Sequence, residues 1–369
     1  MRIGFHGELQ DEPEIRAAFI GCGSHAFRNI YPTFHFAPVK LVATCDMAPG
    51  KAAAFAAKFG AEKSYTDHRQ MLAEGGFEAV FIVVGYDQRG RPGYPDLVVD
   101  CLEAGYHVWL EKPPAATCAD IERMQRAATK AGRTVMVGMK MMFYPANEKA
   151  REIMDQPAFG RSQIVTLQYP EAIPTVEEFR QYYDEGRRVN GVVSFVDHLV
   201  HPASLLIFLL GPPQTLYYER AAGGAGLTMF TFASGAVATL ALTSGSCGRG
   251  GLERTVVFGE KGNHLVVENN IRVSWFKGPL PPYGGSPNYF LGGPEETTAV
   301  WEPEFSLGQL YNKGLFLLGY YGEVNEFARA ILDKRTVSKC NLEQAWQVTR
   351  ILEGFCAGPG KTISLEGRR

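Results

Sequence analysis

Short apolar runs alternate with amphipathic stretches in the part of the chain before Lys140. The apolar runs predict strands at residues 17–20, 39–45, 63–66, 79–84, 107–110 and 134–139. The stretches between them have helical spacing of apolar residues and predict helices at 27–36, 51–59, 67–73, 95–104 and 119–131. Strands interleaved with helices are typical of a doubly wound parallel sheet, and six such strands match a complete dinucleotide-binding domain.

The pattern changes after residue 139 to longer strands in which apolar and polar residues alternate. We expect these strands at 161–169, 215–220, 227–232, 236–243, 254–259, 264–268 and 271–276. Helices are expected at 146–154, 203–210, 323–332 and 342–355. This pattern predicts an open, mostly antiparallel sheet with helices on one face, an α+β arrangement. The stretch 277–308, rich in Pro, Gly and aromatic residues, is predicted to be a long loop serving as a substrate lid or a subunit contact.

The fold class is therefore α/β, with two domains. We expect a Rossmann dinucleotide-binding domain at 1–145 and an α+β substrate-binding and oligomerisation domain at 146–369. With 369 residues, 46% of them hydrophobic, the chain can bury two cores.

Charge and cysteine content exclude several functional classes. The formal charge is −2 with acids and bases interspersed, so neither a nucleic acid nor an anionic membrane is expected as a partner. No run approaches 18 consecutive apolar residues and the first residues lack a signal-peptide pattern, which predicts a cytoplasmic protein. The seven cysteines include no C-x-x-C pair, and we expect reduced, mostly buried thiols rather than disulfides or a zinc site.

A glycine-rich turn follows the first predicted strand: Gly21-Cys22-Gly23-Ser24-His25-Ala26 has the form G-x-G-x-x-A. In such a turn the first glycine permits a tight bend and the second lets the backbone approach a pyrophosphate. The third small residue lets the next helix pack on the strand, so that amides at its start, from Ser24 and His25, face the phosphates. This pattern predicts a dinucleotide site.

Asp46 ends the second predicted strand, and a carboxylate there accepts hydrogen bonds from ribose hydroxyls. The alternative is an Asp that caps the helix beginning near Pro49. A negative charge would repel a 2′-phosphate, which favours NAD over NADP, although Lys51 stands nearby. The loop 85–94, which begins at Gly85, follows the fourth strand and should border the nicotinamide half of the cofactor.

Two further groups of residues are candidates for catalysis. The fifth strand ends in Glu111-Lys112-Pro113, at the carboxyl end of a parallel strand, where open α/β sheets bind ligands. Asp197 and His201 are four residues apart and share a face on a helical turn. A carboxylate and an imidazole beside a nicotinamide supply the proton acceptor that alcohol oxidation needs.

Simpler interpretations of these residues compete with the catalytic one. The Glu-Lys pair could be a polar strand end, Asp197 an N-cap, and His201 an interior histidine. A metal site of Asp197, His198 and His201 lacks the H-E-x-x-H pattern, so no metal is expected.

Together these segments resemble the glucose-fructose oxidoreductase, inositol dehydrogenase and rhizopine catabolism family of NAD(P)-dependent sugar dehydrogenases. The markers are the glycine turn with Asp46, Ala104-Gly105-Tyr106-His107-Val108 before Glu111-Lys112-Pro113, Asp197-x-x-x-His201, and Glu323-Val324-Asn325-Glu326-Phe327-Ala328-Arg329-Ala330-Ile331.

The resemblance implies a role for each matching residue. Lys112 would be the catalytic lysine that contacts the reacting hydroxyl and the nicotinamide, Asp197 would orient the substrate and His201 would be the general base. Pro113, after a cis Lys112-Pro113 bond, would help form the cofactor site with Gly85 and Glu111. A homodimer or homotetramer packed through the open sheet is also implied.

Three departures from the family pattern affect substrate contacts. Ser204 stands where D-x-x-x-H-x-x-D ends in Asp, and loop 85–94 replaces T-P-x-x-x-H, with Tyr94 near the usual His. The arginine after the sixth strand is Lys140 or absent. We therefore expect NAD-dependent oxidation of a secondary hydroxyl of a sugar, inositol or related polyol, or reduction of the matching ketone. The alternatives are an NAD-retaining enzyme that cleaves glycosides through transient oxidation, and a non-catalytic NAD or sugar sensor.

Overall fold

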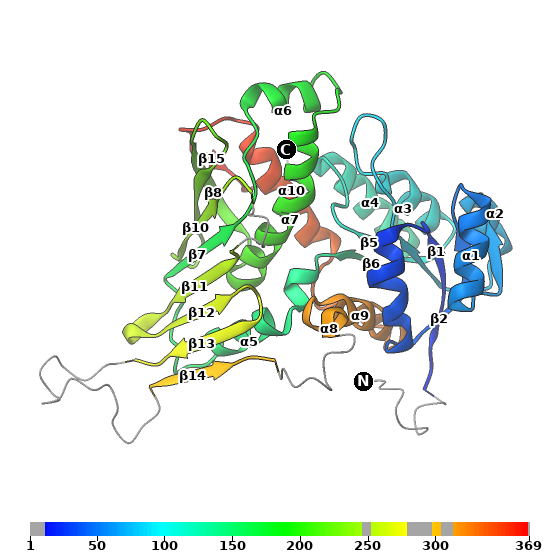
Figure 1. Ribbon diagram of the computed structural model, residues 1–369, viewed down its shortest axis with the longest axis horizontal. Coiled ribbons are helices and arrows are strands. Elements are labelled where there is room, and N and C mark those ends of the chain that lie inside the picture. Colours follow the sequence, from blue (N-terminus) through cyan, green and yellow to red (C-terminus); the bar gives the residue numbers. More distant parts are fainter. Residues whose placement is uncertain (1–11, 246–251, 279–296, 304–312, 368–369) are drawn as a thin grey trace, which may run out of the picture.

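The computed structural model describes residues 12–245, 252–278, 297–303 and 313–367. It contains two sheets with helices between and around them (Figure 1). The first sheet has six parallel strands in the order β3-β2-β1-β4-β5-β6, which confirms the predicted doubly wound domain. Its strands are β1 (Ile15–Ile20), β2 (Val39–Cys45), β3 (Lys63–Tyr65), β4 (Ala79–Ile82), β5 (His107–Glu111) and β6 (Val135–Gly138). Its helices are α1 (Pro49–Phe59), α2 (His68–Glu74), α3 (Tyr94–Glu103) and α4 (Cys118–Ala131).

The predicted helix at 27–36 is confirmed, but its hydrogen-bond pattern is not that of an α-helix. This stretch is helical but consists of a π-helical segment, η2 (Ala26–Ile30), followed by a 3₁₀ segment, η3 (Tyr31–His35). Pro32 lies in the second position of η3, and a proline lacks the N–H that a continuous α-helix would use there. The segment therefore changes its hydrogen-bond pattern at the proline.

The second sheet has nine strands in the order β14-β13-β12-β11-β7-β10-β9-β8-β15. Only β7 and β10 pair in parallel, so the sheet is mostly antiparallel, as predicted. Its strands are β7 (Ile164–Tyr169), β8 (Pro213–Arg220), β9 (Gly226–Phe232), β10 (Val237–Leu242), β11 (Arg254–Phe258), β12 (His264–Glu268), β13 (Arg272–Phe276), β14 (Thr298–Trp301) and β15 (Ile363–Ser364).

Part of the predicted loop 277–308 is a strand. β14 pairs with β13 at the edge of the sheet, a position that the Pro- and Gly-rich composition around it concealed. Residues 279–296 and 304–308 lie outside the described ranges, and so do the expected lid and subunit contact. The two-residue strand β15 was also not predicted, because a run this short carries no pattern.

The long helix α7 (Asn190–Leu210) lies between the second sheet and the first domain (Figure 1). The sequence predicted a helix at 203–210 and a helical turn carrying Asp197 and His201; the structure joins both in one continuous helix that contains Pro202. It is long and apolar enough to cross a membrane by length and composition, but 78% of the most apolar window is buried inside the protein. Burial of this kind is typical of a core helix.

The remaining helices follow β6 along the chain. They are η4 (Lys140–Phe143), α5 (Pro145–Met154), α6 (Val176–Tyr183), η5 (Glu260–Gly262), α8 (Lys313–Leu317), α9 (Tyr320–Leu332) and α10 (Leu342–Phe355). Although α9 follows the second sheet along the chain, it covers the first: the ring of Phe327 packs edge-on against Phe81 of β4, with centroids 5.4 Å apart. The parallel sheet thus obtains part of its cover from the chain's last helices.

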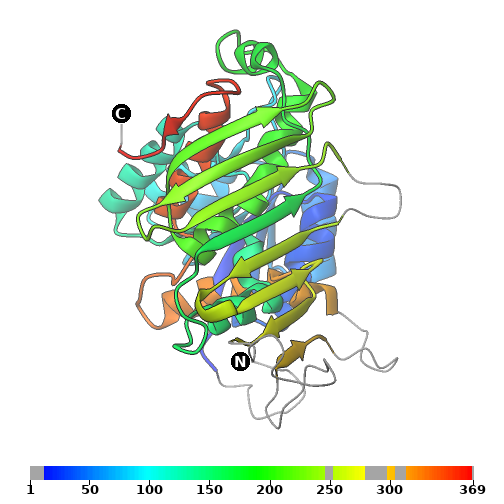
Figure 2. The same ribbon diagram turned by 90° about the vertical axis from the view of Figure 1, so that its left-hand side faces the viewer.

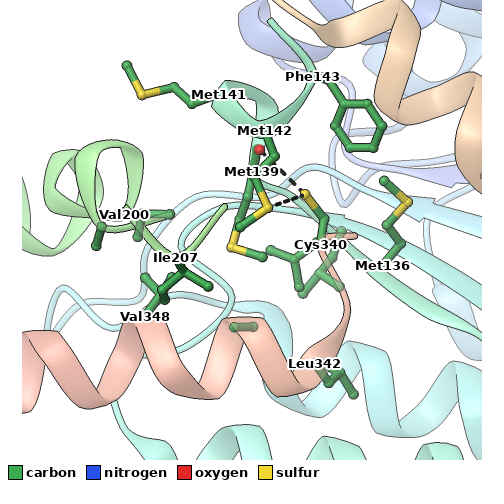
Figure 3. Close-up of a cluster of buried hydrophobic side chains, with 14 of the residues drawn as sticks. Met136, Met139, Met141, Met142, Phe143, Val200, Ile207, Cys340, Leu342 and Val348 are labelled. Carbon is green, nitrogen blue, oxygen red and sulfur yellow. Dashed lines mark hydrogen bonds between the residues drawn. The ribbon is translucent and has the colours of Figure 1, made fainter. Parts of the chain in front are cut away.

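A cluster rich in sulfur joins the two halves (Figure 3). Met139 and Met142, from the segment after β6, lie beside Cys340, whose Sγ is 3.5 Å from Met142 Sδ. Val200 of α7 and Val348 of α10 pack beside them. Methionine adapts to irregular spaces, which suits a junction of four elements. All six described cysteines are free, and five are buried, in agreement with the prediction.

Candidate active site

The glycine turn after β1 is shaped by steric limits at Gly21. This residue has φ +105°, and a Cβ built on it would lie 1.9 Å from the carbonyl oxygen of Val83. Only glycine fits there. At Gly23, in contrast, a Cβ would have no atom within 4 Å, so the backbone is open on that side. Together with the amides of Ser24 and His25 at the start of the helical segment, this open backbone suits a pyrophosphate.

Asp46 holds the glycine turn against the end of β2. Its Oδ2 accepts from the backbone N–H of Cys22 at 2.8 Å and its Oδ1 from that of Ala48 at 2.9 Å. The residue before α1 is Ala48, whose side chain makes no cap, so Asp46 is not the N-cap of that helix. Fixed in this way at the carboxyl end of β2, the carboxylate lies where ribose hydroxyls are bound in this kind of sheet.

A cavity of about 260 Å³ opens at the carboxyl ends of β4 and β5. Residues expected to contact the cofactor or substrate contribute much of its wall. The lining comprises His25, Val83, Val84, Gly85, Tyr86, Tyr94, Glu111, Lys112, Pro113 and Asp197. The structure therefore brings the first-domain candidates and Asp197 of α7 to one place.

Lys112 and Asp197 form an ion pair across the two halves of the protein. Lys112 Nζ lies 3.0 Å from Asp197 Oδ1 and 3.4 Å from the Asp197 carbonyl oxygen. Burial alone would raise the pKa of Asp197, but the Lys112 ammonium and a hydrogen bond from Tyr86 outweigh it, and the pKa is lowered. The peptide bond between Lys112 and Pro113 is cis, as expected.

Glu111 is a buried side chain in the wall of this cavity. Its Oε1 lies 2.8 Å from His25 Nε2, and its Oε2 accepts from the backbone N–H of Lys112 at 2.9 Å. Asn29 contacts the other ring nitrogen of His25 at 3.0 Å. The carboxylate thereby ties the glycine-turn segment to the strand that carries Lys112.

Tyr86 is a site residue that the sequence analysis did not single out. Its hydroxyl donates to Asp197 Oδ1 at 2.5 Å, beside the Lys112 ammonium. Burial, followed by the charge of Asp197, raises the pKa of Tyr86, so the phenol remains a donor. The signal available in the sequence was its position directly after Gly85, in a loop already expected to border the nicotinamide.

The loop that carries Tyr86 is clamped by α6. The Arg91 guanidinium stacks 4.3 Å from the centroid of the Tyr182 ring and donates to the Tyr182 carbonyl at 2.9 Å. The Tyr182 hydroxyl donates in turn to the carbonyl of Gly90 at 2.9 Å. These contacts fix the conformation of the loop 85–94, which stands in place of the T-P-x-x-x-H segment.

His201 lies one helical turn after Asp197 on the same helix, as predicted. It is 8% exposed, and its Nδ1 is buried with no hydrogen-bond partner in the described part of the chain. Burial, and then the charges of Lys112 and Lys140, hold the pKa of His201 well below its ordinary value. The imidazole is therefore neutral at physiological pH, the form that accepts a proton.

Two departures from the family pattern also have structural consequences. Ser204 is fully buried and its hydroxyl donates to the His201 carbonyl at 2.9 Å, so it is occupied within α7. Lys140 donates to the Tyr320 hydroxyl at 2.8 Å, and burial lowers the pKa of this lysine. Within the described ranges, no group of three or more His, Cys, Asp or Glu side chains is arranged to hold a metal ion.

Comparison with known families identifies both halves of the chain. Residues 15–139 match the model described as "Oxidoreductase family, NAD-binding Rossmann fold", and residues 147–264 match the GFO/IDH/MocA C-terminal domain. The chain belongs to the GFO/IDH/MocA oxidoreductase family. The first sheet with its helices is accordingly an NAD-binding Rossmann domain.

Relatives within the GFO/IDH/MocA family include inositol dehydrogenases. The myo-inositol 2-dehydrogenase of Thermotoga maritima is 23% identical over 63% of this chain and 68% of its own length. The inositol 2-dehydrogenase of Salmonella typhimurium is 29% identical over 45% of this chain, and the match spans about half of that protein, 48%. Among solved structures, a levoglucosan dehydrogenase in complex with NADH and levoglucosan is 17% identical, covers 96% of this chain and 100% of its own, and has a TM-score of 0.74.

Proposed function

We propose that the protein is an NAD-dependent dehydrogenase that oxidises a secondary hydroxyl of a sugar, inositol or related polyol, or reduces the matching ketone. The observation that supports this most directly is the 3.0 Å ion pair between Lys112 and Asp197 in the wall of the cavity at the end of the NAD-binding sheet. The relatives named inositol dehydrogenase, and the family model, favour the same reaction.

Each of three residues has a separate task in this proposal. The Lys112 ammonium contacts the reacting oxygen, Asp197 fixes that ammonium and orients the substrate, and neutral His201 accepts the hydroxyl proton. Bound NAD supplies the chemistry of hydride acceptance. Gly21, Gly23 and Asp46 hold the dinucleotide, and the charge of Asp46 favours NAD over NADP.

A substrate panel with a lysine variant tests the proposal. Sugars, polyols and their keto forms are followed at the NADH absorbance with NAD and NADP compared, first in the wild type and then in Lys112→Ala. We expect turnover of at least one panel member with NAD, and a loss of about 100-fold or more in the variant with NAD binding retained. The control Lys58→Ala, at an exposed position on α1, should be unaffected. Full activity in Lys112→Ala contradicts the assignment.

The open face of the second sheet is the proposed subunit interface of a homodimer or homotetramer. Figure 2 shows this face uncovered by helices. Large apolar side chains are exposed on it, at positions that the strand register places on one side: Ile164, Leu227, Met229, Val237, Phe258, Phe276 and Val300. Contiguous exposed apolar surface marks an interaction site. We also propose a cytoplasmic location, which the free and mostly buried described cysteines support, and a division of the chain at 145/146.

A further inference from the structure

Oxidation of an alcohol releases a proton as well as a hydride, and the candidate acceptors are buried or only partly exposed. His201 is 8% exposed, and the side chains of Lys112 and Asp197 are 14% and 27% exposed. If the proposed function holds, one proton per turnover must leave this group for solvent. A more exposed side chain next to these groups could carry that proton to solvent.

His198 occupies the required position. Its Nε2 lies 3.7 Å from Asp197 Oδ2, and its side chain is 45% exposed, the largest exposure among these groups. On the other side of the ring, Nδ1 lies 2.8 Å from Glu171 Oε2 and 3.0 Å from the Ser194 carbonyl oxygen. Because Nδ1 faces two acceptors, it carries the proton in the neutral ring, which leaves the lone pair of Nε2 directed to the Asp197 side.

Glu171 is itself held in place. Its side chain is 11% exposed, and its Oε1 accepts from the backbone N–H of Ala172 at 3.0 Å. The Ser194 hydroxyl lies 3.3 Å from its Oε2. A carboxylate fixed in this way orients the imidazole and stabilises its charged form.

We propose that His198, oriented by Glu171, is the outlet through which the proton released at the substrate hydroxyl leaves Asp197 for solvent. The O–H bond of the substrate breaks and the proton goes to His201; it then passes to Asp197, one turn earlier on the same helix face. The new O–H bond on Asp197 breaks as Nε2–H forms on His198, with one water or a small ring rotation spanning the 3.7 Å gap. His198 finally gives the proton to bulk water, and no electrons move in these transfers.

The local charges make this direction favourable. The hydrogen bond to Glu171 raises the pKa of His198, burial opposes it, and the charge of Asp197 adds to the rise; the Lys112 ammonium acts against it. The pKa of Asp197 is lowered. A proton therefore rests more favourably on His198 than on Asp197, and the charged groups around the ring are Glu171, Asp197 and Lys112.

The pH dependence of turnover is the first test. Only neutral His198 can accept a proton, so kcat for oxidation of myo-inositol, or of the fastest panel member, should rise as pH increases through the pKa of His198. His198→Gln should lose this rise and about 10-fold in kcat with little change in KM, with partial rescue by added imidazole. Glu171→Gln should move the rise to lower pH. The control His35→Gln, at an exposed position, should behave as the wild type. A wild-type profile in His198→Gln without imidazole overturns the proposal.

A titration without substrate separates this inference from the proposed function. In protein labelled at the imidazole carbons, the His198 signal, assigned by its loss in His198→Gln, should titrate above the ordinary histidine value. Its midpoint should fall in Glu171→Gln and in Asp197→Asn, since each removes a neighbouring negative charge. If no polyol yields NADH, the proposed function fails while this coupling is still measured. A midpoint that does not respond to Asp197→Asn overturns the outlet, whether or not the enzyme turns over.

Discussion

Removal of the Tyr86 hydroxyl offers a sensitive probe of the site, because this group and Lys112 share one oxygen of Asp197. In Tyr86→Phe the 2.5 Å hydrogen bond to Oδ1 is lost, while the Lys112 contact at 3.0 Å remains. The carboxylate then has one fewer donor and more freedom to turn, so the ammonium it positions is less well aligned with a substrate oxygen.

The size of the effect follows from the charge of the acceptor. A hydrogen bond to a charged group contributes about 1.5–3 kcal/mol, so kcat/KM should fall by roughly 10- to 100-fold if the bond is retained in the transition state. The pKa of Asp197 should rise, because the phenol is one of the groups that lower it. Initial rates of NADH formation with the best panel substrate measure the first effect, and a carbon-13 NMR titration of the Asp197 carboxyl measures the second. Urea unfolding gives the stability of each variant.

Tyr182→Phe is the matched control. The Tyr182 hydroxyl supports the same loop through the Gly90 carbonyl but does not touch Asp197. Its loss should cost about 1 kcal/mol of unfolding free energy and leave kcat/KM within about 2-fold of the wild type. Equal losses of kcat/KM in the two variants would mean that Tyr86 acts only through loop stability, and wild-type rates in Tyr86→Phe would refute its role altogether.

Three other outcomes are expected. Gly21→Ala should fail to fold stably, because its Cβ would meet the Val83 carbonyl, whereas Gly23→Ala should fold normally but bind NAD more weakly by calorimetry; equal stability of the two variants would contradict this account. The pKa of His201 is lowered in the folded protein, so as pH falls below about 6.5 the histidine is protonated in the unfolded chain before it is protonated in the folded one. The free energy of unfolding should therefore decline by up to about 1.4 kcal/mol per pH unit in this range. Urea midpoints from pH 7 to 5 should decline less steeply in His201→Asn than in the wild type. Leu227→Lys should reduce the molar mass measured by light scattering, and an unchanged assembly would argue against the open sheet face as the interface.

The sequence predicted the fold well where local pattern and tertiary structure agree. Parallel strands buried on both faces are continuous apolar runs, so the ends of β1, β4 and β5 were predicted to within two residues. The prediction from sequence failed where tertiary contacts determine the local structure. Pro202 marks a helix end in isolation, but in α7 the buried surroundings of the helix keep it continuous. Edge strand β14 depends on pairing with β13, which no local pattern reveals.

The candidate site was predictable to the extent that motif spacing implies geometry. Lys112 follows β5 and lines the cavity together with Asp197, a convergence that the positions of the two motifs predicted. That His201 acts with them at the same site stays a prediction. Tyr86 and the His198–Glu171 pair could not be predicted, because each depends on a contact between segments distant in sequence: 111 residues separate Tyr86 from Asp197. Neither contact follows from a periodic pattern.

The same contacts explain why an ordered loop at 85–94 matters for chemistry. Lys112 comes from the Rossmann sheet and Asp197 from a helix of the second half, so the distance between them is set by how the two halves dock. Tyr86 bridges that junction directly, and the stacking of Arg91 on Tyr182 fixes the loop to α6 of the second half. A displacement of about 1 Å can cost on the order of 100-fold in rate. A loop that replaces a shorter motif can therefore change which substrate is accepted and still preserve the ion pair between Lys112 and Asp197. The condition is that the loop holds the two halves of the protein together. The contact between Arg91 and α6 meets that condition.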